Sequence, residues 1–169
     1  MAHNRLTYFL ILILPIFAVA CTGGYSFTGA SIGEAQTIHV KKIPNRAAIV
    51  QPTLSNSLTE ALKDRFVNQT SLELVNSNAD LNFEGTITGY RVTPKSFQGN
   101  ETAALNRLTI TVKIEFTNSL EPDKNFESSF SRYADFESSQ SLSSVEESLI
   151  DEIVEQLTED IFNKAVVNW

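Results

Sequence analysis

Cys21 is the residue whose type and position most directly indicate chemistry. It is the only cysteine of the chain, and it follows the small residues Ala18-Val19-Ala20 at the end of an apolar run that begins at Leu6. Arg5 provides the short basic start of a secretory signal, and the apolar run is its core. A thiol at this point is typical of the lipid-attachment site of a bacterial lipoprotein. We therefore expect residues 1–20 to be a signal peptide and Cys21 to carry acyl chains such as palmitate.

Two alternatives bear on this signal. A permanent membrane span needs roughly 20 apolar residues, and the run from Leu6 to Val19 has only about 14. Cleavage by an ordinary signal peptidase after Ala20 would instead leave Cys21 as a free thiol, which invites intermolecular disulfides in an oxidising compartment. Lipidation is the preferred interpretation because it explains why the only cysteine stands at the cleavage point, although Ala18 occupies a position where leucine is usual.

Few other residues have the types and spacing that catalysis needs. His39 is the only histidine after the signal, and its place on the polar side of a predicted strand indicates a surface histidine. No serine stands in a nucleophile-elbow context, and no glycine-rich loop opens a helix. The acidic pairs near the C-terminus are typical of a solvated helix face. We therefore expect no enzymatic activity, no cofactor and no metal site.

The scarce cations carry the remaining chemical candidate. Arg91 and Lys95 end one predicted strand, and Arg107 begins the next. If these strands pair antiparallel, the three side chains meet at one end of the sheet. They are then either ordinary solubilising charge or a patch that binds anionic head groups, such as those of a phosphorylated glycolipid, through charge-assisted hydrogen bonds.

Composition limits the class of protein. After removal of residues 1–20, the chain has 12 Lys and Arg against 20 Asp and Glu, a charge of −8. An acidic balance argues against nucleic acid, because binding phosphate backbones needs clustered cations. The glycine-rich residues 21–33 are expected to be a lipidated, flexible tether. Residues 34–169 are expected to form one domain.

Periodicity places the structural elements of this domain. Leu108, Ile110, Val112, Ile114 and Phe116 alternate with polar residues, which is the pattern of a strand with one buried face. Apolar residues at three- and four-residue steps predict helices that start at Pro52 and at the capping-box pattern Ser144-Val145-Glu146-Glu147. Further strands are predicted at 37–41, 71–75, from Leu81, and from Phe126 to Phe136.

This order of elements predicts a two-layer α+β sandwich. Because each long strand is apolar on one side only, both helices should cover one face of a mainly antiparallel sheet of four, or with the short strand five, strands. The other face is rich in Thr, Ser, Tyr and mixed charge. It is either simply solvated or packed against another polar surface.

The sequence resembles a known family over nearly all of the expected mature chain. The order of several short motifs carries the resemblance: Cys21 with Gly24-Tyr25-Ser26-Phe27-Thr28-Gly29, Gln51-Pro52-x-Leu54-Ser55, Ala79-Asp80-Leu81-x-Phe83-Glu84-Gly85, Asn106-Arg107-Leu108-Thr109-Ile110 and Asp160-Ile161-Phe162-Asn163. These motifs are similar to those of the LptE family of lipopolysaccharide-assembly lipoproteins, and more narrowly to its divergent branch outside the enteric bacteria.

The resemblance implies an outer-membrane lipoprotein on the periplasmic side, with two helices on a four-stranded sheet. It also implies that the chain partners an LptD β-barrel as a plug in the lumen and helps to load lipopolysaccharide into the outer leaflet. The polar lumen of such a barrel would give the polar sheet face a partner. No family motif for binding lipopolysaccharide aligns here, so Arg91, Lys95 and Arg107 are candidates from this sequence alone. A different class of function remains open, a periplasmic lipoprotein that activates a cell-wall synthesis enzyme.

Overall fold

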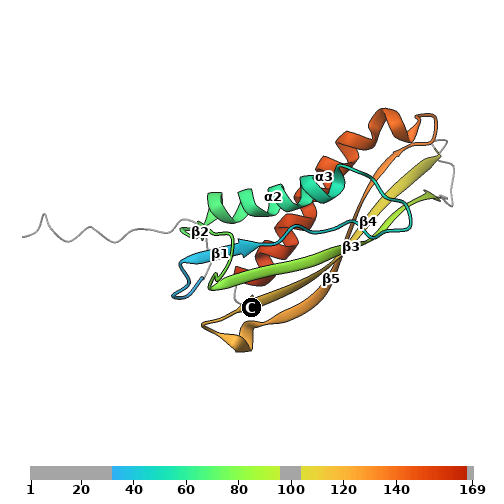
Figure 1. Cartoon of the computed structure of the whole chain (residues 1–169). Coiled ribbons are helices and arrows are strands. Elements are labelled where there is room, and N and C mark those ends of the chain that lie inside the picture. The colour runs from blue at the N-terminus through green and yellow to red at the C-terminus, as the bar shows by residue number, and fades with distance from the viewer. Residues whose placement is uncertain (1–31, 96–103, 167–169) are drawn as a thin grey trace, which may run out of the picture.

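Regular structure forms two layers, a sheet and a pair of helices (Figure 1). The computed structural model describes residues 32–95 and 104–166, so the predicted signal peptide, Cys21 and most of the predicted tether lie outside the described residues. Along the chain the elements are β1 (Thr37–Val40), α2 (Leu54–Gln69), β2 (Glu73–Leu74), β3 (Leu81–Lys95), β4 (Leu105–Asn118), the short 3₁₀ helix η2 (Pro122–Lys124), β5 (Phe126–Glu137) and α3 (Leu142–Val166). Both helices lie on the same side of the sheet, which confirms the predicted two-layer α+β arrangement.

Within the described residues, the sheet contains five strands in the order β2-β1-β3-β4-β5 and is mixed. β3, β4 and β5 form the predicted antiparallel meander, whereas β1 runs parallel to both β2 and β3. The expectation of a mainly antiparallel sheet is therefore right for the meander and wrong for the β1 side. The physical reason is that α2 returns the chain from the end of β1 to the level of the start of β1. The strand that follows, β2, therefore runs in the same direction as β1.

The side chain of Asp80 fixes the parallel pairing of β1 with the start of β3. Its Oδ2 atom accepts the backbone N–H groups of Gln36 and Thr37 at 2.9 and 3.0 Å, and the Thr37 hydroxyl at 2.9 Å. These hydrogen bonds favour the ionised carboxylate and lower the pKa of Asp80. The Thr37 hydroxyl in turn accepts the backbone N–H of Asp80, so each residue satisfies a polar group of the other.

The first helix begins two residues later than predicted. Pro52 precedes α2, and Thr53 at its N-cap makes no side-chain capping bond. The side chain of Gln51 takes this role, because its Oε1 atom accepts the backbone N–H of Leu54 at 2.7 Å and the hydroxyl of Thr53 at 3.0 Å. One of the free N–H groups of the first helical turn is thereby satisfied.

The second helix begins earlier than the predicted capping box. α3 starts at Leu142, so Ser144 lies inside its first turn and its hydroxyl donates to the carbonyl of Ser141 at 2.7 Å. Leu142 and Val145 both pack against the hydrophobic core, which explains why the helix extends back to Leu142. The capping box starting at Ser144 or Ser143 was therefore wrong.

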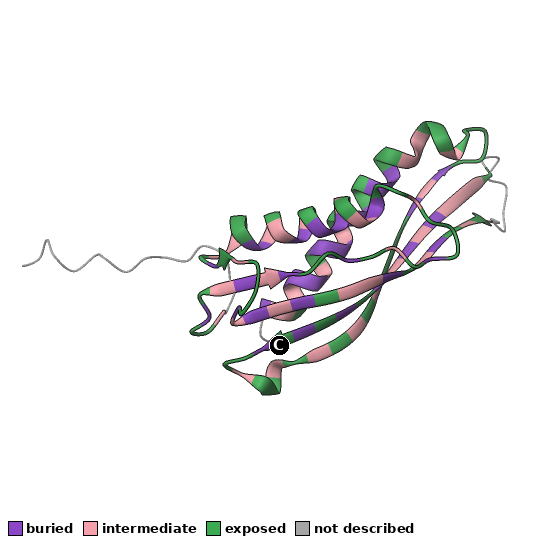
Figure 2. Ribbon diagram, in the orientation of Figure 1, coloured by how far each residue is buried: buried purple, intermediate pink, exposed green. Residues whose placement is uncertain are grey.

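Aromatic side chains link the two layers in the core. Phe66 of α2 contacts Phe83 of β3 and Phe162 of α3, with ring centroids 4.9 and 5.0 Å apart. Phe116 of β4 continues the chain of rings to Phe83 and to Phe126 of β5, at 4.8 and 5.1 Å. Figure 2 shows the buried residues concentrated between the helices and the sheet. The opposite face of β3, β4 and β5, here called the outer face, is left without a covering layer among the described residues.

Candidate functional site

A β-bulge decides which side chains of β3 reach the outer face. The register between β3 and β4 shifts between Ile87 and Gly89, so Thr88 is an extra residue. Before the bulge, odd-numbered residues such as Ile87 are buried; after it, the buried residue is Tyr90. Without the shift, Arg91 would continue the buried row, and the extra residue instead turns it to the outer face.

The three candidate cations lie on the outer face at the same end of the sheet. Arg107 of β4 pairs with Thr93 of β3. Thr93 lies between Arg91 and Lys95 among the β3 side chains on the outer face. Arg91 is exposed, and the side chains of Lys95 and Arg107 are 36% and 25% exposed. The predicted arrangement of Arg91, Lys95 and Arg107 at one end of the sheet is therefore the observed arrangement.

Asp135 of β5 binds two of these cations. Its Oδ1 accepts Arg107 Nε at 2.7 Å, and its Oδ2 accepts Arg107 Nη2 at 2.8 Å and Lys95 Nζ at 3.0 Å. The Arg107 guanidinium lowers the pKa of Asp135 to about 2, and Lys95 adds to this effect, while burial opposes it. Because the fork of hydrogen bonds is bidentate, Arg107 is held in one orientation.

Tyr133 completes the surroundings of Arg107. The guanidinium carbon of Arg107 lies 3.4 Å from the centroid of the Tyr133 ring, a close cation–π contact. We name the five residues Arg91, Lys95, Arg107, Tyr133 and Asp135 the basic cluster. Glu137 lies in the row of Lys95 across β4, so the described residues place three cations and two carboxylates at this end of the face. The cluster is thus a local group of cations held by carboxylates and is not a broad basic field.

The far end of the outer face carries acids. Glu84, Glu115 and Glu127 occupy one row across β3, β4 and β5. Lys41 pairs with Glu84 at 2.9 Å and Lys113 with Glu127 at 2.7 Å, so two of the three carboxylates are neutralised. Hydroxyl residues fill the middle of the face, where the hydroxyls of Thr111 and Ser131 lie 3.0 Å apart. The described outer face is therefore polar from end to end.

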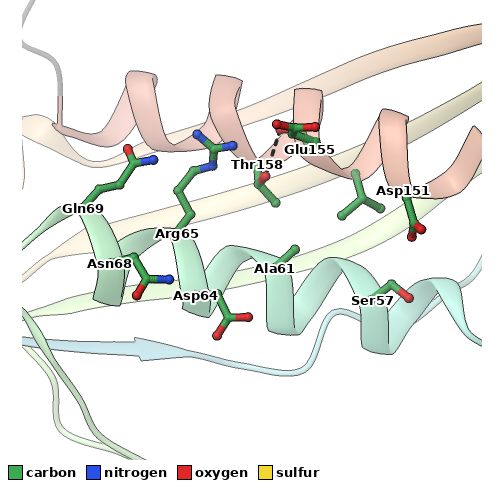
Figure 3. Close-up of a pocket in the computed structure, with 10 residues that line it drawn as sticks. Ser57, Ala61, Asp64, Arg65, Asn68, Gln69, Asp151, Glu155 and Thr158 are labelled. Carbon is green, nitrogen blue, oxygen red and sulfur yellow. Dashed lines mark hydrogen bonds between the residues drawn. The ribbon is translucent and has the colours of Figure 1, made fainter. Parts of the chain in front are cut away.

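A groove runs between the two helices on the opposite side of the molecule (Figure 3). It has a volume of about 390 Å³ and is lined by Ser57, Ala61, Asp64, Arg65, Asn68, Gln69, Asp151, Val154, Glu155 and Thr158. Arg65 extends from α2 toward α3, and the other charged lining residues are acidic. The lining includes no nucleophile with a base beside it, so the groove has no constellation for covalent catalysis.

His39 lies against the backbone of the segment that follows β2. His39 is half-buried, and its Nδ1 lies 3.0 Å from the carbonyl oxygen of Val75. It lies on the predicted strand β1, and its ring contacts the backbone carbonyl of Val75. Across residues 32–95 and 104–166, no group of His, Cys, Asp and Glu side chains is placed to hold a metal ion. In the same ranges, no helix combines the length and apolarity needed to cross a bilayer.

Comparison with known families agrees with the resemblance read from the sequence. The model of the family described as "LptE: Lipopolysaccharide-assembly" matches residues 35–165, more than three quarters of the chain. The chain belongs to the LptE family. No curated protein matches this LptE-family chain at the level of sequence.

Solved structures support the fold. The LptE-family chain is similar to protein XCC0632 from Xanthomonas campestris, with 12% identity, a TM-score of 0.53, and coverage of 82% of this chain and 87% of the other. It is also similar to a neuraminyllactose-binding hemagglutinin homolog from Helicobacter pylori, with 6% identity, a TM-score of 0.50, and coverage of 78% and 83%. At these identities the likeness establishes a shared fold alone.

No sequence pattern indicated that Asp135 and Tyr133 belong to the basic cluster. Asp135 lies 28 residues from Arg107 and 40 from Lys95 along the chain, so no local spacing connects them. The alternation of the strand beginning at Phe126 placed Tyr133 on the polar face correctly. Only the register between β4 and β5, which pairs Arg107 with Asp135, could have indicated the contact.

Proposed function

We propose that the chain is a lipid-anchored lipoprotein on the periplasmic side of the outer membrane, where it partners an LptD-type β-barrel and assists lipopolysaccharide assembly. Membership of the LptE family supports this role. The anchor is Cys21, and it acts as an attachment point and not as a catalytic group. No step of this role requires the chain to make or break a covalent bond, so we propose a non-enzymatic assembly factor.

The polar outer face is the observation that supports a barrel partner. Tyr133, at 49% exposure, is the only exposed large apolar side chain described on β3, β4 and β5. Hydroxyls and charged side chains, several of them in ion pairs, cover the rest, and such a surface matches the polar interior of a transmembrane barrel. The basic cluster lies at one end of this face, where it would contact a phosphorylated head group while the remaining face contacts the barrel.

Co-purification tests this function. The mature chain, extracted from its own membranes in mild detergent, should bring down a large outer-membrane β-barrel. Thr111→Arg, which places a bulky cation in the middle of the outer face, should reduce barrel recovery, whereas Ser57→Arg on the helix side should not. Recovery of a peptidoglycan synthase without a barrel would support the activator role instead and would contradict our proposal.

A further inference from the structure

The two edges of the sheet differ in their protection against strand pairing. On the β1 side, β2 has only two residues. The half of β3 beyond the Asn45–Ile87 bridge contains the bulge at Thr88, Pro94 and the terminal Lys95. Short strands, bulges, proline and lysine are the usual devices that prevent an edge from pairing with another chain.

β5, at the opposite edge, has none of these devices. Its twelve residues contain no proline, lysine or glycine, and its register with β4 continues without a bulge from Phe126 to Glu137. Figure 1 shows β5 at the border of the sheet, and no described strand pairs with its outer side. The single inward charge, Arg132, is bound by Asp160 of α3 and is therefore not left to repel an incoming strand.

The pairing with β4 determines which backbone groups face outward. The N–H of Ser138 donates to the carbonyl of Ala104 at 2.9 Å, in line with the β4–β5 register. In an antiparallel pair such bonds recur every second residue, so the even-numbered residues of β5 bond to β4. The odd-numbered residues point their N–H and C=O groups away from the sheet: Glu127, Ser129, Ser131, Tyr133, Asp135 and Glu137.

The side chains along this edge indicate which residue types an added strand should carry. On the inner side, Phe126 and Phe130 pack against the core but remain only half-buried, so they would gain from apolar neighbours. On the outer side, Glu127, Asp135 and Glu137 are acids, and no residue of that row is basic. Lys113 pairs with Glu127, and Arg107 and Lys95 pair with Asp135, so the row's local excess of negative charge lies at Glu137, whose carboxylate accepts the Ser139 hydroxyl. A complementary strand would carry apolar residues inward and basic or hydroxyl residues outward.

β5 of a second copy of this chain does not have these complementary side chains. Two such edges can bond only in registers that pair odd-numbered residues with one another, and the two of these with the greatest overlap place Glu127 opposite either Asp135 or Glu137 on the same face. Like charges directly opposite destabilise a pair of strands. The edge is thus better matched to a different sequence than to itself.

We propose that the free edge of β5 is a docking site for an extended segment of another protein, which adds to the sheet as a sixth strand. This segment alternates apolar side chains with basic or hydroxyl side chains. Backbone hydrogen bonds to the odd-numbered residues hold it, as in other cases of strand addition. The proposal does not depend on a barrel partner, because the edge lies beside the outer face and not on it.

Amide hydrogen exchange of the purified full chain, followed by NMR, tests the docking site. The probe is a synthetic eight-residue peptide that alternates valine with lysine and threonine. It should slow exchange at Ser129, Ser131 and Tyr133 at least tenfold, with little change at the even-numbered residues that already bond to β4. The same peptide with glutamate in place of lysine should bind at least tenfold more weakly.

A matched pair of variants isolates the backbone contact. Ser131→Pro removes one outward N–H and should weaken peptide binding at least tenfold, whereas Ser131→Ala should bind within twofold of the wild type. Both lose the same hydroxyl contact with Thr111. If Ser131→Pro lowers the melting temperature markedly, Ser129→Pro replaces it, because that N–H also points outward.

Four results would overturn the proposal. The first is unchanged exchange along β5 at every soluble peptide concentration, and the second is slowing along residues 88–95 of β3 instead. The third is slow exchange of the odd-numbered amides in dilute protein without peptide, which would mean that the chain covers its own edge. The fourth is slowing that grows with protein concentration alone, which would make a second copy the occupant.

Discussion

The hydroxyl of Tyr90 donates a hydrogen bond to the carboxylate of Glu146 and thereby joins β3 to the first turns of α3. Tyr90 is buried, and it faces the helices only because the bulge at Thr88 shifts the alternation of β3. Burial raises the pKa of Tyr90, and Glu146 raises it further. The bulge therefore has two effects, since it turns Arg91 outward and brings Tyr90 under α3.

Tyr90→Phe should destabilise the domain while preserving its fold. The ring stays in the core, but a hydrogen bond to a charged group is lost, which costs about 1.5–3 kcal/mol. Tyr133→Phe is the control on the outer face: it also loses a hydroxyl contact, with Arg107, but at an exposed site this should cost less than about 1 kcal/mol. Urea unfolding at pH 7 measures both, and equal losses would mean that the Tyr90–Glu146 bond contributes nothing.

The Tyr90–Glu146 hydrogen bond should also affect how stability depends on pH in alkaline solution. Because the folded pKa of Tyr90 is raised above its ordinary value of 10.0, its contribution is complete below pH 10 and is lost as pH rises beyond it. The stability of the wild type should therefore fall more steeply above pH 10 than that of Tyr90→Phe. Parallel curves would show that Tyr90 titrates normally.

Val112→Asp should unfold the domain, whereas Thr111→Asp should leave it folded. Val112 is completely buried, and Thr111 lies next to it on the outer face. A buried unpaired carboxylate costs several kcal/mol, a large part of a total stability of roughly 5–15 kcal/mol. Thermal unfolding followed by circular dichroism separates the two variants. Equal losses would show that both faces of the sheet are covered.

The strands were predictable where one periodicity continues without interruption. β4 matches its predicted alternation because its residues from Leu108 to Phe116 meet the helices on one face only. In β3, the alternation fails beyond Ile87, since an inserted residue changes the face of every residue that follows. Gly89 was the available signal, because a glycine inside a strand pattern often marks a bulge.

Other features depended on long-range packing, which a local pattern does not record. Serines at 141, 143 and 144, followed by Glu146 and Glu147, offer several equivalent helix starts. Contact of Leu142 with the core selects among them. Likewise, the parallel direction of β1 follows from where α2 packs, and the binding of Arg107 by Asp135 follows from strand register.

Asp135→Asn should reduce the acid sensitivity of the domain. Arg107 lowers the pKa of Asp135 to about 2, below an ordinary value near 3.8. A carboxyl whose folded pKa is lowered stabilises the fold above its unfolded pKa, and this contribution is lost as pH falls through the folded pKa. Between about pH 4 and pH 2 the wild type should therefore lose more stability than Asp135→Asn. Acid unfolding of both proteins, followed by far-UV circular dichroism, measures the difference. Identical unfolding curves would contradict the prediction.

Cys21→Ser should leave the protein unprocessed or released from the membrane. The residues after Cys21 include no apolar run comparable to that of the signal, so the acyl chains are the expected anchor. Membrane fractionation, with mass spectrometry of the mature N-terminus, measures the effect. An unmodified Cys21 in the wild type, or a mature chain that starts elsewhere, would exclude the lipid anchor.

Replacement of Arg91, Lys95 and Arg107 by Ala should weaken binding of lipopolysaccharide by more than roughly tenfold, because several charge-assisted contacts are lost together. A matched control removes the same charge away from the basic cluster, through Ala at Lys41, Lys113 and Lys124. Binding of labelled lipopolysaccharide to the purified full chain measures both variants. Equal weakening would mean that only overall charge matters.

Asp135 provides a second test of lipopolysaccharide binding by these cations, because its carboxylate competes with any bound phosphate for Arg107 and Lys95. Asp135→Asn removes the competing charge and should strengthen lipopolysaccharide binding, in the direction opposite to the triple variant. Since the chain as a whole is acidic, attraction must act locally, and both effects should shrink as salt rises. If Asp135→Asn weakens binding instead, the carboxylate acts by holding Arg107 in place for the ligand. If neither Asp135→Asn nor the triple variant changes affinity, these cations serve only to hold the strands together.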